Sequence, residues 1–303
     1  MSRYPKCRRN LNFQKDLGEV KDEAEEKSNF FFTCGRALLF ACRLSEEQAY
    51  QKAEKENTIQ AFEEFLKKYP KGEYSRSARG HLALLYFQKA AKEDTISAYE
   101  DYIARFPDSR LRPEAVRKLM KMLEPEINRL TPEQMKKLRA VIQTDYGEIW
   151  LRFYPEKAPN TCRNFIKLAR SHFYDLSSFH LIIPGELIQG GAPRGDPRGG
   201  PGYTIKAEFN DLPHTPGAVG MARRSHPDTA GSQFYITLVK MPERDGKYTV
   251  FAYVEKGLEV ARKISFLPSS GANGKPYPFK PLEPVVIKSI KIIPLEKEGK
   301  NGG

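Results

Sequence analysis

Hydrophobic residues recur at two different spacings along the chain, one in each half. In residues 59–69 the apolar side chains fall every three or four positions, which is the spacing of one face of an α-helix. Asn57 or Thr58 supplies the expected N-cap of this helix, and Pro70 stops it. From Arg139 onward, apolar and polar residues alternate in short runs between Gly and Pro turns, as in half-buried β-strands. The pattern predicts a helical N-terminal half and a β-rich C-terminal half.

The helical half contains a duplicated unit. Residues 49–74 align with residues 85–111 at a constant offset of 37 positions, so that Thr58 matches Thr95. The unit resembles a degenerate tetratricopeptide repeat, although the Trp-x-x-Leu-Gly opening of the standard repeat is absent. Such helix pairs stack into solenoids that bury the apolar face of each repeat against its neighbour. The resemblance implies a module that holds a peptide or a partner protein, with a plain docking or spacing module as the alternative.

Two further helical segments separate the repeats from the β-rich half. We expect the repeats to occupy residues 45–123, with a helix at residues 112–123 that closes the array. Residues 124–138 are expected to form a helical linker.

The β-rich half predicts a closed barrel. Residues 140–154 contain two alternating strands around a turn at residues 145–147, which is a hairpin signal. Many short strands with Gly and Pro turns, and only two helices, favour a barrel over a layered α/β sheet. The whole chain is therefore expected to be a multidomain α + β protein, with the barrel at residues 139–294 and a flexible tail at residues 295–303.

Five segments of the β-rich half carry a specific signature. They are FYPEKAPNTCRNF, FYDLSSFHLIIPGELIQGG, GGPGYTIKAEF, GSQFYITL and DGKYTVFAYVEKGLEVARKI. Their order and spacing resemble those of the cyclophilins, a family of peptidyl-prolyl cis-trans isomerases, over about residues 139–293. The resemblance implies an eight-stranded barrel capped by two helices. It also implies action on X-Pro bonds of proteins, in a folding or chaperone role, without a cofactor.

Leu181 departs from the family at the position of the catalytic donor. The cis-trans isomerisation of an X-Pro bond crosses a barrier of about 18–20 kcal/mol. Twisting the bond localises a lone pair on the prolyl nitrogen. A fixed donor aimed at that nitrogen stabilises the twisted state. The resemblance implies an Arg donor two residues after the Phe of the FH motif, where this chain has Leu181. By analogy with the loss of one oxyanion donor, we expect a rate lower by about 10² to 10³.

The other pocket positions implied by the family fall into two groups. Charged residues replace apolar or neutral ones at four positions: Glu186, Arg223, Glu243 and Arg244. The predicted substrate-binding residues are those that match fully or loosely: Leu187, Gln189, Ala222, Gln233, Tyr235 and Tyr248. Tyr235 is one of the loose matches, because the resemblance implies a Phe at this position. One interpretation is weak isomerisation, either with Arg223 or Arg244 in place of the missing donor or through Gln189 and the pocket shape. The other is an inactive peptide-binding or scaffold protein whose repeats recruit a partner.

Charge and cysteine content narrow the expected partners. The chain carries 50 Lys and Arg against 38 Asp and Glu, a net charge of +12, but the basic residues are scattered, so nucleic acid is not expected. The four cysteines and five histidines lack metal-ligand spacing, so no metal site is expected. We expect Cys162 to be a small apolar core residue of a helix. We expect His180 to have a structural role. The expected partners are proline-containing peptides or proteins and a protein partner of the repeats.

The N-terminal segment, residues 1–44, bears on location. Residues 30–42 form an apolar run of about 13, too short to span a bilayer, for which about 20 residues are needed. The run ends in Leu-Phe-Ala-Cys, which resembles a bacterial lipobox and makes Cys42 a candidate for lipidation and membrane anchoring. Arg36 and the long, partly acidic stretch before the run oppose a signal peptide. Two alternatives remain open: a lipoprotein or periplasmic protein of the cell envelope, and a cytoplasmic protein in which the run is a buried helix.

Overall fold

The computed structural model describes residues 46–193 and 198–295 of the chain. The chain divides into two compact units, residues 1–82 and residues 83–303. The expectations for the N-terminal segment, including lipidation of Cys42, lie outside the described residues, as does almost all of the expected tail. The division falls inside one helix, at residues 82 and 83, and not between the repeats and the barrel. The domain boundaries expected from the sequence therefore remain predictions.

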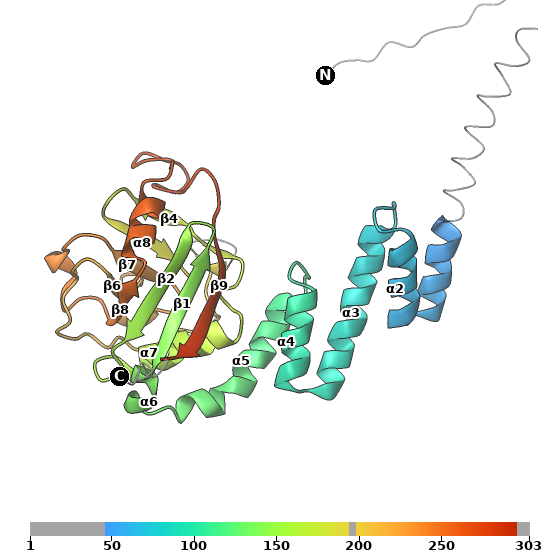
Figure 1. Ribbon diagram of the computed structural model, residues 1–303, viewed down its shortest axis with the longest axis horizontal. Helices are drawn as coiled ribbons and strands as arrows, with labels where there is room; N and C mark the ends of the chain where they lie inside the picture. Colours follow the sequence, from blue (N-terminus) through green and yellow to red (C-terminus); the bar gives the residue numbers. More distant parts are fainter. Residues whose placement is uncertain (1–45, 194–197, 296–303) are drawn as a thin grey trace, which may run out of the picture. The chain divides into compact units, whose positions relative to one another are not determined.

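The first unit consists of helical segments. A helix at residues 46–56 and α2 (Ile59–Lys68) precede the start of α3 (Ser75–Glu93) (Figure 1). Thr58 is the N-cap of α2, and its hydroxyl accepts a hydrogen bond from the backbone N–H of Ala61 at 3.2 Å. Phe62 and Phe65 are buried and pack around the ring of Tyr50, with centroids 6.5 and 5.6 Å away. The apolar face expected from the sequence is thus the buried face of α2.

The second unit begins with the duplicate of this arrangement. Thr95 caps α4 (Ile96–Arg105) and accepts from Ala98 at 3.2 Å, the same contact in the same place as in the first repeat. The next helix, α5 (Arg112–Asn128), runs past the expected end at residue 123 and through Pro125. A short helix, α6 (Pro132–Lys136), follows it. No helix in the described ranges is long and apolar enough to cross a membrane.

The rest of the second unit is a nine-stranded antiparallel sheet that closes almost into a barrel. The order is β3-β9-β1-β2-β8-β6-β7-β5-β4, and an isolated bridge links Ser178 of β3 to Ala192, two residues after β5, so the sheet almost closes on itself. The strands are β1 (Leu138–Thr144), β2 (Gly147–Phe153), β3 (Ser177–Phe179), β4 (Leu181–Ile183), β5 (Leu187–Gly190), β6 (Ala218–Met221), β7 (Phe234–Thr237), β8 (Val250–Lys256) and β9 (Val285–Pro294). The helices beside it are α7 (Pro159–Arg170) and α8 (Leu258–Ser265), with 3-10 turns η2 (Pro227–Thr229) and η3 (Pro242–Arg244).

The expected eight strands become nine because one of them is split at His180. On one side of this residue β3 pairs with β9, and on the other side β4 pairs with β5. The chain therefore changes its neighbour at His180, whose backbone N–H donates to the carbonyl of Gln189 at 3.0 Å. The strand number was wrong by this one break, whereas the barrel and its helices are confirmed.

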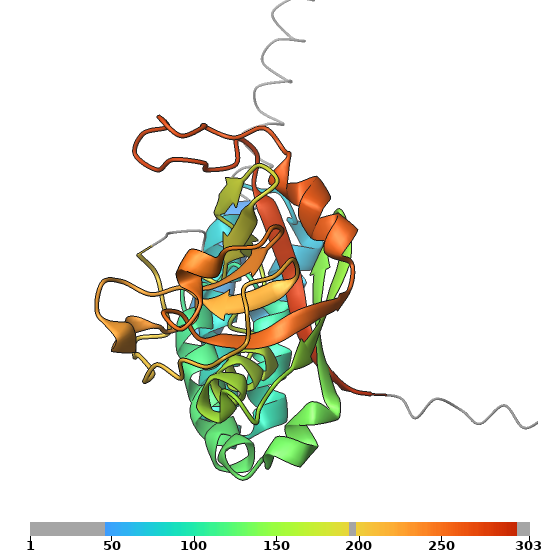
Figure 2. The same ribbon diagram turned by 90° about the vertical axis from the view of Figure 1, so that its left-hand side faces the viewer.

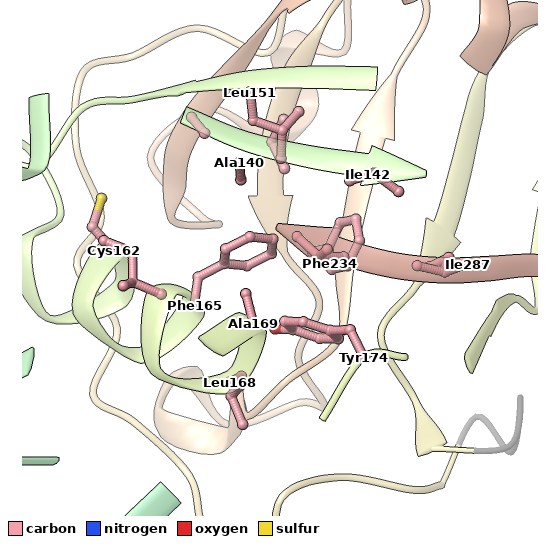
Figure 3. Close-up of a cluster of buried hydrophobic side chains, with 14 of the residues drawn as sticks. Ala140, Ile142, Leu151, Cys162, Phe165, Leu168, Ala169, Tyr174, Phe234 and Ile287 are labelled. Atoms are coloured by element: carbon pink, nitrogen blue, oxygen red, sulfur yellow. The ribbon is translucent and has the colours of Figure 1, made fainter. Parts of the chain in front are cut away.

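Aromatic side chains from α7, from the segment after it and from the sheet fill the barrel (Figure 3). Phe165 of α7 lies among the rings of Tyr174, Phe234 and Phe251, with centroids 5.1, 5.4 and 5.2 Å away, and all four are fully buried. Cys162 lies on the same helix, where burial raises the pKa of its thiol. This cysteine is therefore an inert core residue, as the sequence predicts.

Helix α5 packs against α7 within the second unit. The hydrophobic core runs without a break from α4 and α5 into the barrel. At its edge, Arg163 donates from Nε and Nη2 to the carbonyl of Leu130 at 3.1 and 2.9 Å, and Lys167 Nζ lies 2.9 Å from Glu124 Oε1. The second repeat, α5 and the barrel therefore share one core.

The connection between α8 and β9 extends away from the sheet (Figure 2). Its Phe279 carbonyl accepts a hydrogen bond from the backbone N–H of Ile182 at 2.9 Å. The connection therefore covers part of the free edge of β4.

Candidate active site

A small apolar cluster lies outside the barrel core, on the sheet formed by β4, β5 and β7. Leu187, Tyr235 and Met241 are buried in it, and partly buried residues pack around them: Leu181, Ile183, Ala222 and Tyr248. Five of these seven were singled out in the sequence. We call this cluster the prolyl pocket, because the resemblance to the cyclophilins implies that a substrate's proline ring would bind at these residues.

Leu181 borders the prolyl pocket from β4. It pairs across the ladder with Gln189, and Gln189 pairs in turn with Tyr235 of β7. Cross-strand partners project from the same face of a sheet, so the register brings the three side chains together. A hydrocarbon side chain therefore borders the pocket where a guanidinium is expected.

The two predicted glutamines are hydrogen-bonded to each other beside this pocket. Gln189 donates from Nε2 to Gln233 Oε1 at 2.9 Å, and Gln233 donates from Nε2 to the carbonyl of Gly199 at 3.0 Å. They border a second hollow of about 490 Å³, which Arg223 and Arg224 also line. The pair is suited to bind the backbone of an extended peptide.

The guanidinium of Arg223 is hydrogen-bonded to backbone carbonyls of the surrounding loops. Its guanidinium donates to the carbonyl of Lys247 from Nε and Nη2, at 3.1 and 3.0 Å. Its Nη1 donates to the carbonyls of Arg224 and Ser225 at 2.9 and 3.0 Å. The guanidinium also lies 4.5 Å from the ring centroid of Tyr248. This arginine ties two loops together beside the pocket.

Arg244 lies over the two aromatic rings of the prolyl pocket. Its guanidinium is 5.1 Å from the ring centroid of Tyr235 and 5.3 Å from that of Tyr248. Its ion pair with Glu243 is loose, at 3.8 Å. Burial raises the pKa of the Tyr235 phenol, and the charge and hydrogen bonding of Arg244 oppose the shift. The Arg244 guanidinium therefore lies against both rings, and the side chains that it contacts there are Glu243, Tyr235 and Tyr248.

His214 and Asp245 belong to the site and were not predicted. His214 was set aside as one of five dispersed histidines, yet its Nε2 lies 2.8 Å from the Tyr235 hydroxyl and its Nδ1 lies 2.8 Å from Asp245 Oδ1. The signal in the sequence was Tyr235, because a Tyr in an apolar pocket needs a partner for its hydroxyl.

Titratable side chains form no metal cage in the part of the chain that the structure describes. Among residues 46–193 and 198–295, no three His, Cys, Asp or Glu side chains are grouped so as to hold a metal ion. His180 is buried where the strand is split.

The comparisons with known proteins agree with this geometry. The family model of the cyclophilin type peptidyl-prolyl cis-trans isomerase/CLD matches residues 139–292, and that of the tetratricopeptide repeat matches residues 48–72 and 81–109. A peptidyl-prolyl cis-trans isomerase of Synechococcus elongatus is 44% identical over 128 residues, which are 42% of this chain and 88% of the relative. Peptidyl-prolyl cis-trans isomerase B of Bacillus subtilis is 49% identical over 123 residues, which are 40% of this chain and 85% of the relative.

One solved structure is similar to half of this chain. It is a cyclophilin type peptidyl-prolyl cis-trans isomerase of Cryptosporidium parvum in the presence of the dipeptide Ala-Pro, with 32% identity. The match covers 51% of this chain and 98% of that one, with a TM-score of 0.47. An almost closed antiparallel barrel with two helices is the cyclophilin class of fold. This chain belongs to the cyclophilin-type peptidyl-prolyl cis-trans isomerases and carries tetratricopeptide repeats ahead of the barrel.

Proposed function

We propose that the barrel isomerises X-Pro bonds of peptides and proteins at a reduced rate, with Arg244 as the donor to the prolyl nitrogen. The observation that carries this proposal is the guanidinium of Arg244 at 5.1 Å from the ring centroid of Tyr235. An arginine over the floor of an apolar pocket can donate to a nitrogen held inside it, and it is worth most where water is excluded.

The prolyl pocket is suited to grip a proline ring. Leu187 and Tyr235 are 2% and 1% exposed, so the floor is apolar and dry. Tyr235 and Tyr248 meet edge to face, with centroids 6.0 Å apart, which fixes both rings. The Gln189–Gln233 pair next to them offers amide groups to the peptide backbone on either side of the proline.

Arg244 is a better donor than Arg223, the other substitute considered from the sequence. The three donor nitrogens of Arg223 are hydrogen-bonded to loop carbonyls, so the use of Arg223 in catalysis would break those bonds. Arg244 has a weak ion pair with Glu243 at 3.8 Å, which is worth little at the surface, and while one of its N–H groups bonds the Tyr235 hydroxyl its other N–H groups remain for a prolyl nitrogen.

The test is the rate of cis-trans exchange of an Ala-Pro-Phe type peptide, measured by NMR at micromolar protein. We expect wild-type protein to accelerate exchange and Arg244→Leu to lower kcat/KM by about tenfold or more. The matched control is Arg152→Leu, the same chemical change at an exposed residue of β2, which should leave the rate unchanged. Wild-type rates in Arg244→Leu would show that Arg244 is not the donor.

A second candidate function is peptide binding without turnover. It is supported by Leu181, because a hydrocarbon at this place strengthens the apolar grip on a proline and gives no donor. This alternative predicts that wild-type protein binds the same peptide, seen as shifts of the Tyr235 and Tyr248 resonances, and does not change the exchange rate. The two candidate functions are thus separated by a single NMR sample.

The repeats and the N-terminal segment extend the proposal to partners and location. Tetratricopeptide repeats generally mediate protein interactions, so we assign them the recruitment of a client or partner protein for the barrel. Lipidation of Cys42 would anchor this protein, and with it the recruited client or partner, at a membrane. Incorporation of labelled palmitate that is lost in Cys42→Ala supports this anchoring, and equal labelling of both proteins contradicts it.

A further inference from the structure

His214 is enclosed between the floor of the prolyl pocket and the turn that carries Arg244. Its side chain is 0% exposed, and its ring stacks on that of Tyr235, with centroids 5.9 Å apart and an angle of 18° between the planes. Nε2 lies 2.8 Å from the Tyr235 hydroxyl, and Nδ1 lies 2.8 Å from Asp245 Oδ1. An imidazole bonded at both nitrogens is fixed in orientation and in tautomer.

The chemistry of the partners sets the direction of these hydrogen bonds. The backbone N–H and the side chain of His214 hold the pKa of Asp245 below its usual value, so this carboxylate accepts. His214 therefore donates from Nδ1, and a neutral imidazole that does so accepts at Nε2 from the Tyr235 hydroxyl. The lone pairs of the phenolic oxygen are then left for a donor, and the donor beside it is Arg244.

The backbone of His214 holds the same turn at both ends. Its carbonyl accepts from the N–H of Met241 at 2.8 Å, immediately before η3. Its own N–H donates to Asp245 Oδ1 at 2.7 Å, immediately after η3. Arg244 is the last residue of η3, so its place over the pocket depends on a turn that His214 fixes from both sides.

We infer that His214, Asp245 and Tyr235 are positioning residues that aim the Arg244 guanidinium into the prolyl pocket. The inference rests on the proposed function, in which Arg244 is the donor. The hydroxyl of Tyr235 is the group on which this positioning depends, because the Phe that the family resemblance implies here has no oxygen to accept a hydrogen bond from Arg244. Arg244 is then the relocated donor, and the Tyr at residue 235, in place of Phe, supplies the hydroxyl that positions it.

Tyr235→Phe tests the inference, because it removes the hydroxyl and keeps the ring. We expect kcat for peptide exchange to fall by about tenfold, the scale of one hydrogen bond to a charged group. KM should stay within about twofold, since the apolar grip is unchanged. In Tyr235→Phe/Arg244→Leu the rate should equal that of Arg244→Leu alone, because the hydroxyl acts through the arginine.

Two variants of His214 give an independent readout. His214→Gln carries an amide that can donate to Asp245 and accept from Tyr235, so it should recover part of kcat relative to His214→Leu. A loss of kcat that is equal in the two variants, or a wild-type kcat in Tyr235→Phe, would overturn the inference while Arg244→Leu remains slow. Wild-type rates in Arg244→Leu would instead contradict the proposed function itself.

Discussion

Leu181 lies directly opposite Gln189 in the antiparallel β4–β5 pair, so the two side chains project from the same face of the sheet and Leu181 borders the prolyl pocket. Leu181→Arg restores a donor at this position. Because the new charge must share the pocket with Arg244, and like charges repel each other there, we expect kcat/KM to rise by less than about tenfold. Exchange of the Ala-Pro-Phe type peptide gives the measurement.

Ile183→Arg is the matched control for this gain. Ile183 lies two residues further along the same strand and packs on the same cluster. It should show no increase. A gain of about 10² or more in Leu181→Arg would mean that no other guanidinium competes for the pocket.

Gly220 makes room for the phenol of Tyr235. The two residues pair across β6 and β7, and a Cβ at residue 220 would lie 2.4 Å from the Tyr235 hydroxyl oxygen. Gly220→Ala should therefore displace the ring, lower the free energy of unfolding by about 1–3 kcal/mol and slow exchange. Gly200→Ala, where a Cβ meets nothing within 4 Å, is the control for stability. Equal stability of the two variants would show that the pocket adapts to the extra methyl group.

Arg139 and Glu255 form a bidentate ion pair that stabilises the barrel in a pH-dependent way. The distances are 2.6 and 3.0 Å, and the hydrogen bonds from Arg139 lower the pKa of Glu255. A carboxylate whose pKa is lower in the folded state contributes stability above its unfolded pKa, about 4.3, and loses it as the pH falls through the folded value. Glu255→Gln should thus lower the free energy of unfolding by about 1 kcal/mol at pH 7 and by clearly less near about pH 2.

The chain's one tryptophan reports this difference. Trp150 lies on β2, and β2 pairs with β8, which carries Glu255, so urea titrations followed by its fluorescence measure unfolding of the barrel. A difference between wild type and Glu255→Gln that is the same at both pH values would contradict the assignment.

Arg223 should matter for stability more than for catalysis. Arg223→Gln removes hydrogen bonds to three carbonyls, including that of Lys247, and we expect it to lower the free energy of unfolding by about 1–2 kcal/mol. Its kcat should fall less than that of Arg244→Gln. The opposite order of the two kcat values would assign the donor to Arg223.

The parts of the fold that depend on neighbours in the sequence were predictable. Thr58 and Thr95 bond to backbone three residues away, so their capping role can be read from the local pattern. The break at His180 was not predictable, because it depends on which strand lies on either side.

Five members of the prolyl pocket were named from the sequence, but their roles were not predictable. A motif places Leu181 and Arg244 at pocket positions, but the choice of Arg244 over Arg223 depends on the carbonyl of Lys247, which has no sequence signature. His214 was missed because its partners are 21 and 31 residues away along the chain.

The most direct test of the relocated donor is the rate of cis-trans exchange of the Ala-Pro-Phe type peptide. It compares Arg244→Leu with the double variant Leu181→Arg/Arg244→Leu, which moves the arginine from residue 244 to residue 181. If Arg244 supplies the donor, Arg244→Leu is slower than wild type by about tenfold or more, and the added Leu181→Arg returns the rate to wild type or above. An Arg244→Leu protein as fast as wild type would contradict the account.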